Sequence, residues 1–184
     1  HQADVIRLQK LQKYGGIYLD IDTICLKSFD ELRFYDFVIG IQGNKNNSEI
    51  YGLCNAVMLS KPQSEFVIEW IDTYTTFRSK GRDEYWDEHS VLMPLKLAYK
   101  YNTKIKILDN NVFYNPLWYN INSILFSESI DLSEYKKIIN NNYCIHLWDT
   151  YTNKYLSKLT ENEILNKNTI YNIFSRKFIR NKIS

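Results

Sequence analysis

Two acidic residues, Asp20 and Asp22, stand one residue apart at the end of a short apolar run, residues 17–19. Side chains two positions apart on an extended chain point to the same side, so both carboxylates can face one cation. Carboxylate oxygens suit Mg²⁺ and Mn²⁺, and a metal held by few protein ligands keeps open positions for phosphate oxygens. We therefore interpret the two residues as candidate ligands of Mn²⁺ or Mg²⁺. The alternative is an acidic pair that only turns the chain or caps an element.

A second pair of charged residues, Asp4 and Arg7, lies three residues apart in a segment with helical spacing of apolar residues, 3–13. Such a pair can be a local ion pair worth a few tenths of a kcal/mol. It can also lean over the acidic pair, where Asp4 would accept hydrogen bonds from sugar hydroxyls and Arg7 would donate to hydroxyl or phosphate oxygens. Both interpretations stay open at this point.

The elements that must position these residues alternate between strands and helices. Gly15 and Gly16 end the first helix, and residues 17–19 and 24–26 have extended character on either side of the acidic pair. The same patterns predict further strands at 34–41, 56–59, 104–108 and 143–147, and helices at 62–78, 86–101, 131–139 and 160–178. We expect a polar loop at 44–49 and an irregular segment at 113–119. This alternation predicts an α/β layer architecture.

Length and composition are typical of one globular domain, which we place at residues 1–184. The chain is 45% hydrophobic and 24% charged, with a net charge of +2, so no overall positive field favours nucleic acid as a partner. No apolar run reaches the ~20 residues of a membrane-spanning helix, and we expect no membrane segment in this chain. Three widely spaced cysteines in apolar stretches, Cys25, Cys54 and Cys144, predict buried reduced thiols rather than disulfides or a zinc site.

Together, these residues resemble a known family. The segment with Asp4, Arg7, the Gly15-Gly16 turn and Tyr18 before the two acids is similar to the DXD-containing region of family 32 glycosyltransferases and of the glucosylating domains of large clostridial toxins. The match is close over about the first thirty residues, and it is much more specific than the Asp-x-Asp pair alone.

The resemblance implies a GT-A fold, the nucleotide-diphospho-sugar transferase fold, with a mixed sheet flanked by helices. The implied reaction transfers a hexose from a UDP- or GDP-sugar to a glycan or protein acceptor, with retention of configuration, as in polysaccharide biosynthesis. Asp20 and Asp22 would then be the catalytic residues that hold Mn²⁺ or Mg²⁺, with Asp22 as the direct ligand. Asp4, Arg7 and Tyr18 would surround the transferred sugar.

Three residues farther along also match the family pattern. Asn55 is a candidate substrate contact, although a turn residue before a strand is an equal alternative. His146 is a candidate third ligand for the metal or the phosphate, against a purely structural histidine in an apolar strand. Trp148 can stack on the substrate or pack in the core.

The chain departs from the family in two places. Residues 87–91 replace a Gly-Pro that many relatives carry, which leaves the acceptor contacts undefined. The chain also begins just before the helix with Asp4 and Arg7, whereas a GT-A domain starts with earlier strands that hold the base. We therefore expect a GT-A-like domain that lacks its N-terminal strands.

Two other functions compete with this one. The sequence from Asp20 to Thr23 also fits the signature of haloacid-dehalogenase-like Mg²⁺-dependent phosphatases, in which the first Asp is a nucleophile. That class leaves Asp4 and Arg7 without a role, and it needs a later acidic pair that the sequence does not show convincingly. A non-catalytic sugar-binding or scaffold domain is the third possibility.

Overall fold

The main sheet of the protein contains four strands in the order β1 (Gly16–Leu19), β4 (Glu49–Ser60), β3 (Phe37–Lys45) and β5 (Ile105–Leu108). The pairs β1–β4 and β4–β3 are antiparallel, and β3–β5 is parallel. A second sheet pairs β2 (Thr23–Cys25) with β6 (Cys144–His146) in antiparallel register. These elements come from a computed structural model that describes residues 2–45, 49–81, 83–101 and 104–179.

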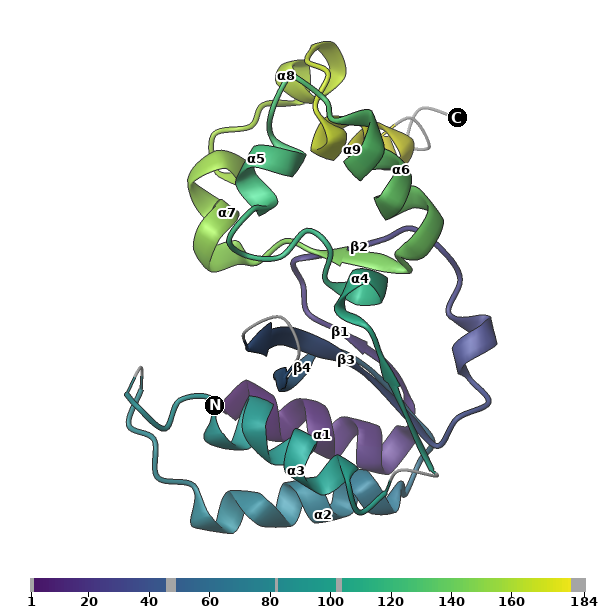
Figure 1. Ribbon diagram of the computed structural model, residues 1–184, viewed down its shortest axis with the longest axis vertical. Coiled ribbons are helices and arrows are strands. Elements are labelled where there is room, and N and C mark those ends of the chain that lie inside the picture. The colour runs from purple at the N-terminus through teal and green to yellow at the C-terminus, as the bar shows by residue number, and fades with distance from the viewer. Residues whose placement is uncertain (1, 46–48, 82, 102–103, 180–184) are drawn as a thin grey trace.

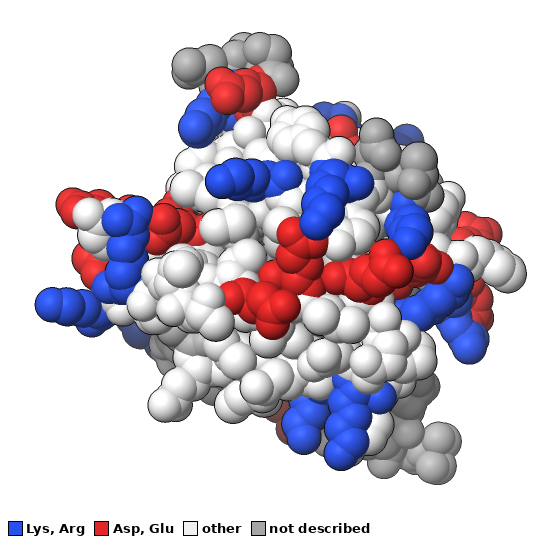
Figure 2. All heavy atoms as spheres, turned by 90° about the horizontal axis from the view of Figure 1, so that it is seen from below, with Lys and Arg blue, Asp and Glu red and all other residues white. Residues whose placement is uncertain are grey.

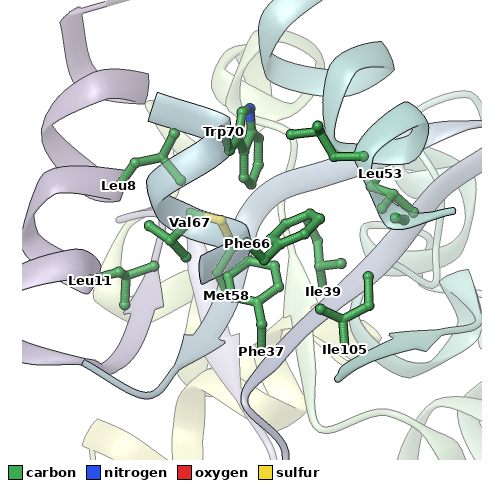
Figure 3. Packing of buried hydrophobic residues seen from close by; sticks show 12 residues of the cluster. Leu8, Leu11, Phe37, Ile39, Leu53, Met58, Phe66, Val67, Trp70 and Ile105 are labelled. Atoms are coloured by element: carbon green, nitrogen blue, oxygen red, sulfur yellow. The ribbon is translucent and has the colours of Figure 1, made fainter. Parts of the chain in front are cut away.

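Three helices cover one face of the main sheet: α1 (Gln2–Tyr14), α2 (Glu65–Thr73) and α3 (Met93–Ala98) (Figure 1). β3 alternates as a half-buried strand does, so Phe37 and Ile39 face this helix layer and Val38 faces the other side. The core between the layers combines the apolar faces of the first two helices with the sheet (Figure 3), and includes Leu8, Leu11, Phe37, Ile39, Met58, Phe66, Val67, Trp70 and Ile105.

The opposite face of the sheet leads into a lobe of short helices. Phe113 is the last residue of α4 (Asn110–Phe113), and Tyr114 comes next. Both side chains pack in a core with Val38 and Val57. Beyond β2 and β6 lie the remaining helices (Figure 1): α5 (Ile121–Leu125), α6 (Leu132–Asn141), α7 (Asp149–Leu156), α8 (Glu161–Asn166) and α9 (Ile170–Ile179). Their buried side chains form a third cluster that includes Ile145 of β6. The second sheet therefore lies between the main sheet and the helical lobe.

The predicted α/β class, with a mixed sheet flanked by helices, is confirmed. The first helix is confirmed too, and it ends at the predicted glycines: Gly15 and Gly16 have φ values of 63° and 98°. Such backbone angles favour glycine because a Cβ atom is strained there. The predicted helix at 131–139 corresponds to α6, and the predicted strands at 104–108 and 143–147 to β5 and β6.

Several predicted boundaries were wrong. β3 begins at Phe37 rather than at residue 34, and β4 runs over Glu49–Ser60 rather than 56–59 alone. The strands therefore extend into the predicted 44–49 loop, of which residues 46–48 lie outside the described part. The helix predicted from Pro62 begins only at Glu65, because Gln63 adopts φ 57° and its N–H donates to the Gln12 carbonyl. It ends at Thr73, and a short 3₁₀ turn, η2 (Tyr74–Thr76), follows.

Two predicted helices are interrupted. The 86–101 segment contains a π-helix, η3 (Glu88–Leu92), and then α3. Pro94 lies in the first turn of α3, where proline is favoured. The 160–178 segment divides into α8 and α9. Thr160 and Glu163 form a capping box at the start of α8. The buried Asn172 amide donates to the Glu163 and Lys167 carbonyls at the end of α8, so the chain can turn there.

The surface and the cysteines complete the description. Seen from below (Figure 2), acidic and basic side chains are interspersed. The described cysteines are free, and Cys54 and Cys144 are buried as predicted, but Cys25 is exposed at the end of the two-stranded sheet.

A further 3₁₀ turn, η1 (Asp30–Leu32), lies between β2 and β3. In the described part of the chain, no helix has the length and apolar character needed to cross a membrane.

Candidate functional site

The Asp20–Asp22 pair lies where the chain leaves one sheet for the other. After β1, the Asp20 N–H donates to the Ala56 carbonyl at 2.8 Å. Before β2, the Asp22 carbonyl accepts from the Leu147 N–H, also at 2.8 Å. The segment between them is a turn with Ile21 fully exposed, not the extended strand end that we expected. The two hydrogen bonds fix both ends of this turn and place the acids at the border between the two lobes.

The Asp20 carboxylate has one oxygen held by protein donors. Its Oδ1 accepts a 2.6 Å hydrogen bond from the Tyr18 hydroxyl and lies 3.0 Å from Arg7 Nη1. Its Oδ2 lies on the other side, 3.9 Å from His146 Nε2. One oxygen of Asp20 therefore belongs to the network around Arg7, and the other faces the imidazole.

Asp22 repeats this arrangement. Its Oδ2 accepts from the Asp149 N–H at 2.9 Å, and its Oδ1 lies 3.2 Å from His146 Nε2. Burial raises the pKa of Asp22, but the hydrogen bond and charge of His146 and the Asp149 N–H outweigh burial and hold this pKa below its usual value. The carboxylate is therefore ionised near neutral pH, as a metal ligand must be.

The structure brings the three predicted metal ligands together. One ligand atom from each of Asp20, Asp22 and His146 lies within 4.8 Å of the others. His146 comes from β6, where it pairs with Thr23, and its ring packs edge-on against Trp148 with the centroids 4.4 Å apart. Two carboxylates and one imidazole are a donor set that fits a divalent cation. The identity of the metal does not follow from these contacts.

Arg7 is buried at the centre of a polar network behind the metal pair. Its Nη1 donates to the Asn55 carbonyl at 2.8 Å and to the Asn55 side-chain oxygen at 3.2 Å. Its Nη2 lies 3.7 Å from Asp4 Oδ1, which also accepts a 2.8 Å hydrogen bond from the Asn55 amide. The pair Asp4–Arg7 is thus both a local ion pair and part of a site assembled from α1, β1 and β4.

Tyr18 completes this network. Arg7 lies over its ring, with 4.6 Å between the guanidinium carbon and the centroid. Burial, and next the hydrogen bond to Asp20, raise the pKa of Tyr18 well above its usual value. Its hydroxyl therefore stays protonated and acts as a hydrogen-bond donor that orients Asp20.

Asn55 reaches the network because β4 bulges at this point. Ile39 pairs with Met58, yet the next residue, Gly40, pairs with Cys54, so the residues between Cys54 and Met58 leave the ladder with β3. The buried Tyr114 hydroxyl donates to the Cys54 carbonyl at 2.9 Å and to the Val57 carbonyl at 3.4 Å. A Cβ atom on Gly40 would stand 2.6 Å from the Tyr114 ring, so only glycine leaves room for it. Asn55, for which a turn residue was the alternative to a substrate contact, is therefore part of a strand bulge.

Trp148 stands in a strained conformation beside the metal pair, with φ 54° and ψ 62°. Bulky residues seldom adopt this left-handed region, and its cost is offset here by specific contacts. The indole N–H donates to the Pro116 carbonyl at 3.2 Å, and the ring packs against Trp118 and His146. The ring packs in the core and also lines a cavity, and its stacking on a substrate stays a prediction.

A cavity of about 430 Å³ joins these features, which is within the range of small-molecule sites. Five predicted residues line it: Asp4, Asp20, Asn55, His146 and Trp148. Arg7, Tyr18 and Asp22 are not among the lining residues but contact those that are. Sequence reasoning did not assign the other nine lining residues to the site. They carry no motif and come from strands, from η3, from the start of α7 and from turns: Gln42, Cys54, Ala56, Trp86, Ser90, Val91, Trp118, Thr150 and Tyr151.

The phosphatase alternative fits this geometry poorly. Its nucleophilic aspartate would need an unhindered carboxylate oxygen, but Asp20 Oδ1 is engaged by Tyr18 and Arg7. β1 is an antiparallel strand at the sheet edge, whereas that signature normally opens the first strand of its domain. Among the described residues that line the cavity there is no lysine to serve the phosphoryl group.

Comparison with known proteins agrees with the site. Residues 1–38 match the family model described as glycosyltransferase sugar-binding region containing DXD motif. The chain is 33% identical over 183 residues to Glucan organizing enzyme 1 of Cryptococcus neoformans var. grubii, covering 97% of this chain and 48% of that protein. It is 27% identical over 165 residues to an uncharacterized protein of Arabidopsis thaliana, covering 83% and 24% of the two chains. Residues 1–38 therefore resemble the sugar-binding region of DXD-motif glycosyltransferases, and the predicted resemblance of the chain to family 32-like glycosyltransferases is confirmed.

Proposed function

We propose that the protein is a metal-dependent hexosyltransferase that uses a UDP- or GDP-sugar as donor. The observation that carries this proposal is that the two oxygens of each carboxylate have different partners. Asp20 and Asp22 each have one oxygen held by protein donors and the other directed toward His146. Such a pair can take a divalent cation while it keeps its hydrogen bonds from Tyr18 and the Asp149 N–H, and bonds to the metal would replace the contact between Asp22 and His146.

The rest of the cavity suits the two ends of a nucleotide-sugar. We assign the diphosphate to the end with Asp20, Asp22 and His146, and the hexose to the end with Asp4 and Asn55. When bound, Mn²⁺ or Mg²⁺ would neutralise the charge that develops on the departing nucleoside diphosphate. The combination of carboxylates with an imidazole nitrogen favours Mn²⁺ over the harder Mg²⁺.

The protein's own groups would bind and orient the hexose. The Asp4 carboxylate and the Asn55 side chain can exchange hydrogen bonds with sugar hydroxyls, because they already pair with each other at 2.8 Å beside the cavity. Arg7 would hold both of them in place. In the reaction, the bond from the anomeric carbon to the diphosphate breaks and a bond to an acceptor hydroxyl oxygen forms, with loss of its proton. From the family resemblance we propose retention of configuration.

The acceptor is proposed from a relative. The name of the Cryptococcus protein refers to glucan, and the present chain spans about half of that protein's length. We propose a glycan acceptor and a role in polysaccharide biosynthesis. The two lobes would then work as one unit, residues 1–184, because metal ligands come from both sides of their border.

The experiment is an assay of UDP or GDP release from UDP-glucose, UDP-N-acetylglucosamine and GDP-mannose, with Mn²⁺ and with EDTA. We expect release from one donor with Mn²⁺, no release with EDTA, and none from Asp22→Asn. Asp72→Asn, an exposed carboxylate on α2, is the matched control and should keep the activity. Phosphate release from p-nitrophenyl phosphate without sugar transfer would contradict the proposal in favour of a phosphatase.

A further inference from the structure

Tryptophan is concentrated at the cavity. The chain has four tryptophans, of which Trp70 is fully buried in the main core. The other three, Trp86, Trp118 and Trp148, all line the cavity, together with Tyr151. The metal ligands and the Arg7 network account for none of these aromatic side chains except Trp148, which packs against His146.

Two of these four aromatic side chains, Trp118 and Trp148, pack against each other, and the other two, Trp86 and Tyr151, are exposed to solvent. Trp118 and Trp148 pack edge-on against each other with ring centroids 5.3 Å apart. Trp86 and Tyr151 have exposed fractions of 46% and 47%. Leaving large apolar rings half in water forgoes burial that would otherwise stabilise the fold. Trp86 and Tyr151 also line one cavity, and aromatic side chains are common in the lining of ligand sites.

The turn that carries Trp86 is fixed by hydrogen bonds. Asp83 accepts from the Lys80 N–H at 2.6 Å and from the Tyr85 N–H at 3.0 Å. The Trp86 N–H donates to the Asp83 carbonyl at 3.2 Å. On the far side, Arg78 makes a two-pronged contact with Glu88 at 2.8 and 2.9 Å. Hydrogen bonds therefore hold the backbone from which the exposed Trp86 ring extends.

Tyr151 is presented from the other lobe. It lies in the first turn of α7, where its N–H donates to the Trp148 carbonyl at 2.7 Å. Its own carbonyl accepts from the Asn122 amide at 3.1 Å. The two exposed rings thus line one cavity from two separately anchored elements, one in each lobe.

We propose that Trp86 and Tyr151 form the acceptor site and that the acceptor is an oligosaccharide. This inference rests on the proposed transferase function. A sugar ring has an apolar C–H face, which packs on aromatic rings, and a rim of hydroxyls, which exchange hydrogen bonds with polar side chains. The same cavity supplies such partners from uncharged side chains: Gln42, Ser90 and Thr150.

The position of Trp86 favours a sugar over a nucleobase, which can also stack on aromatic rings. Trp86 leads into η3, which packs on β4, the strand that carries Asn55. This contact is close, since a Cβ atom on Gly52 of β4 would stand 2.3 Å from Val91 Cγ1. The segment with Trp86 therefore contacts the strand that supplies the proposed hexose contacts, whereas a base would lie beyond the proposed position of the diphosphate.

The test measures saccharide binding directly, so it does not depend on turnover. Saturation-transfer NMR would be recorded with linear oligosaccharides of β-1,3-glucose, β-1,6-glucose, α-1,4-glucose, mannose and N-acetylglucosamine. We expect binding of at least one oligosaccharide, a loss of tenfold or more in affinity for Trp86→Ala and Tyr151→Ala, and substantial rescue in Trp86→Phe. Tyr99→Ala, an exposed tyrosine outside the cavity lining, is the matched control and should bind as wild type does.

Calorimetry with UDP and GDP in the presence of Mn²⁺ on the same proteins separates the two proposals. Absence of nucleotide binding to the wild-type protein would count against the transferase function. The saccharide data would still show whether Trp86 and Tyr151 bind an oligosaccharide. Oligosaccharide binding that is absent, or equal in wild type and Trp86→Ala, would overturn the inference. A tenfold loss of nucleotide affinity in Trp86→Ala would assign the ring to the base and overturn it too.

Discussion

At the scale of single residues, the site is an arrangement of compensated charges. Asp4 and Asp20 share the guanidinium of Arg7, and Asp22 is compensated by His146 and a backbone N–H. Asp4, Arg7, Asp20 and Asp22 were predicted as site residues from their types and spacing, and Asn55 and His146 from the family resemblance. The individual contacts between them, such as that of Arg7 with Asn55, were not predicted, because they join segments far apart in sequence.

Arg7 should matter for stability as well as for binding. In Arg7→Ala, Asp4 and Asp20 lose their common cation in a mostly buried place, so we expect the free energy of unfolding to fall by about 3 kcal/mol. Urea titration of the purified protein measures this. Arg33→Ala removes an exposed Arg–Asp pair of similar length, and should cost less than about 1 kcal/mol. Equal effects of the two substitutions would show that the Arg7 network is not a buried charge cluster.

The pKa of Asp22 gives a prediction about acid stability. Burial raises this pKa, but His146 and the Asp149 N–H lower it further than burial raises it, so it lies below the unfolded value. The ionised side chain therefore stabilises the fold above the unfolded pKa, and this contribution is lost as pH falls through the folded pKa. In urea titrations between about pH 6 and about pH 3, we expect wild type to lose more stability than Asp22→Asn. A steeper loss in the mutant would contradict this account.

At the scale of elements, the bulge in β4 places Asn55 in contact with Arg7. The apolar run at residues 56–59 predicted a short strand, but a bulge leaves no clear mark on such a run, and the rest of β4 was not predicted. The structural signs of the bulge are Gly40 and the buried Tyr114, which lie on other elements. The π-helix at 88–92 and the break at 167–169 were not predicted for a related reason: they depend on tertiary contacts, such as the Asn172 amide on α8.

Tyr114 should therefore act as a positioning residue for the bulge. Tyr114→Phe removes the donor to the Cys54 and Val57 carbonyls, in a place that water does not reach, and should cost about 1–3 kcal/mol of unfolding free energy. We also expect weaker nucleotide-sugar binding with unchanged Mn²⁺ binding, because Asn55 moves and the metal ligands do not. Calorimetry with each ligand distinguishes this from general destabilisation. Tyr119→Phe, at an exposed tyrosine, is the control.

At the scale of the whole molecule, the cavity exists because two lobes meet at the Asp20–Asp22 turn. The sheet lobe contributes Asp4 and Asn55, and the segment from β6 into α7 contributes His146 and Trp148. The α/β class and the resemblance to sugar transferases were predictable from the sequence. The assignment of Trp86, Trp118 and Tyr151 to the same cavity was not, because their positions depend on how the lobes pack.

The most direct test of the metal-dependent site is calorimetric titration of UDP and GDP into the protein, with Mn²⁺ and with EDTA, for wild type, Asp22→Asn and Asp72→Asn. The account predicts that one nucleotide binds to wild type and to Asp72→Asn only with Mn²⁺, and that Asp22→Asn binds neither nucleotide while it remains folded by circular dichroism. Nucleotide binding that persists in EDTA or in folded Asp22→Asn, or no binding of either nucleotide to wild type with Mn²⁺, would contradict it.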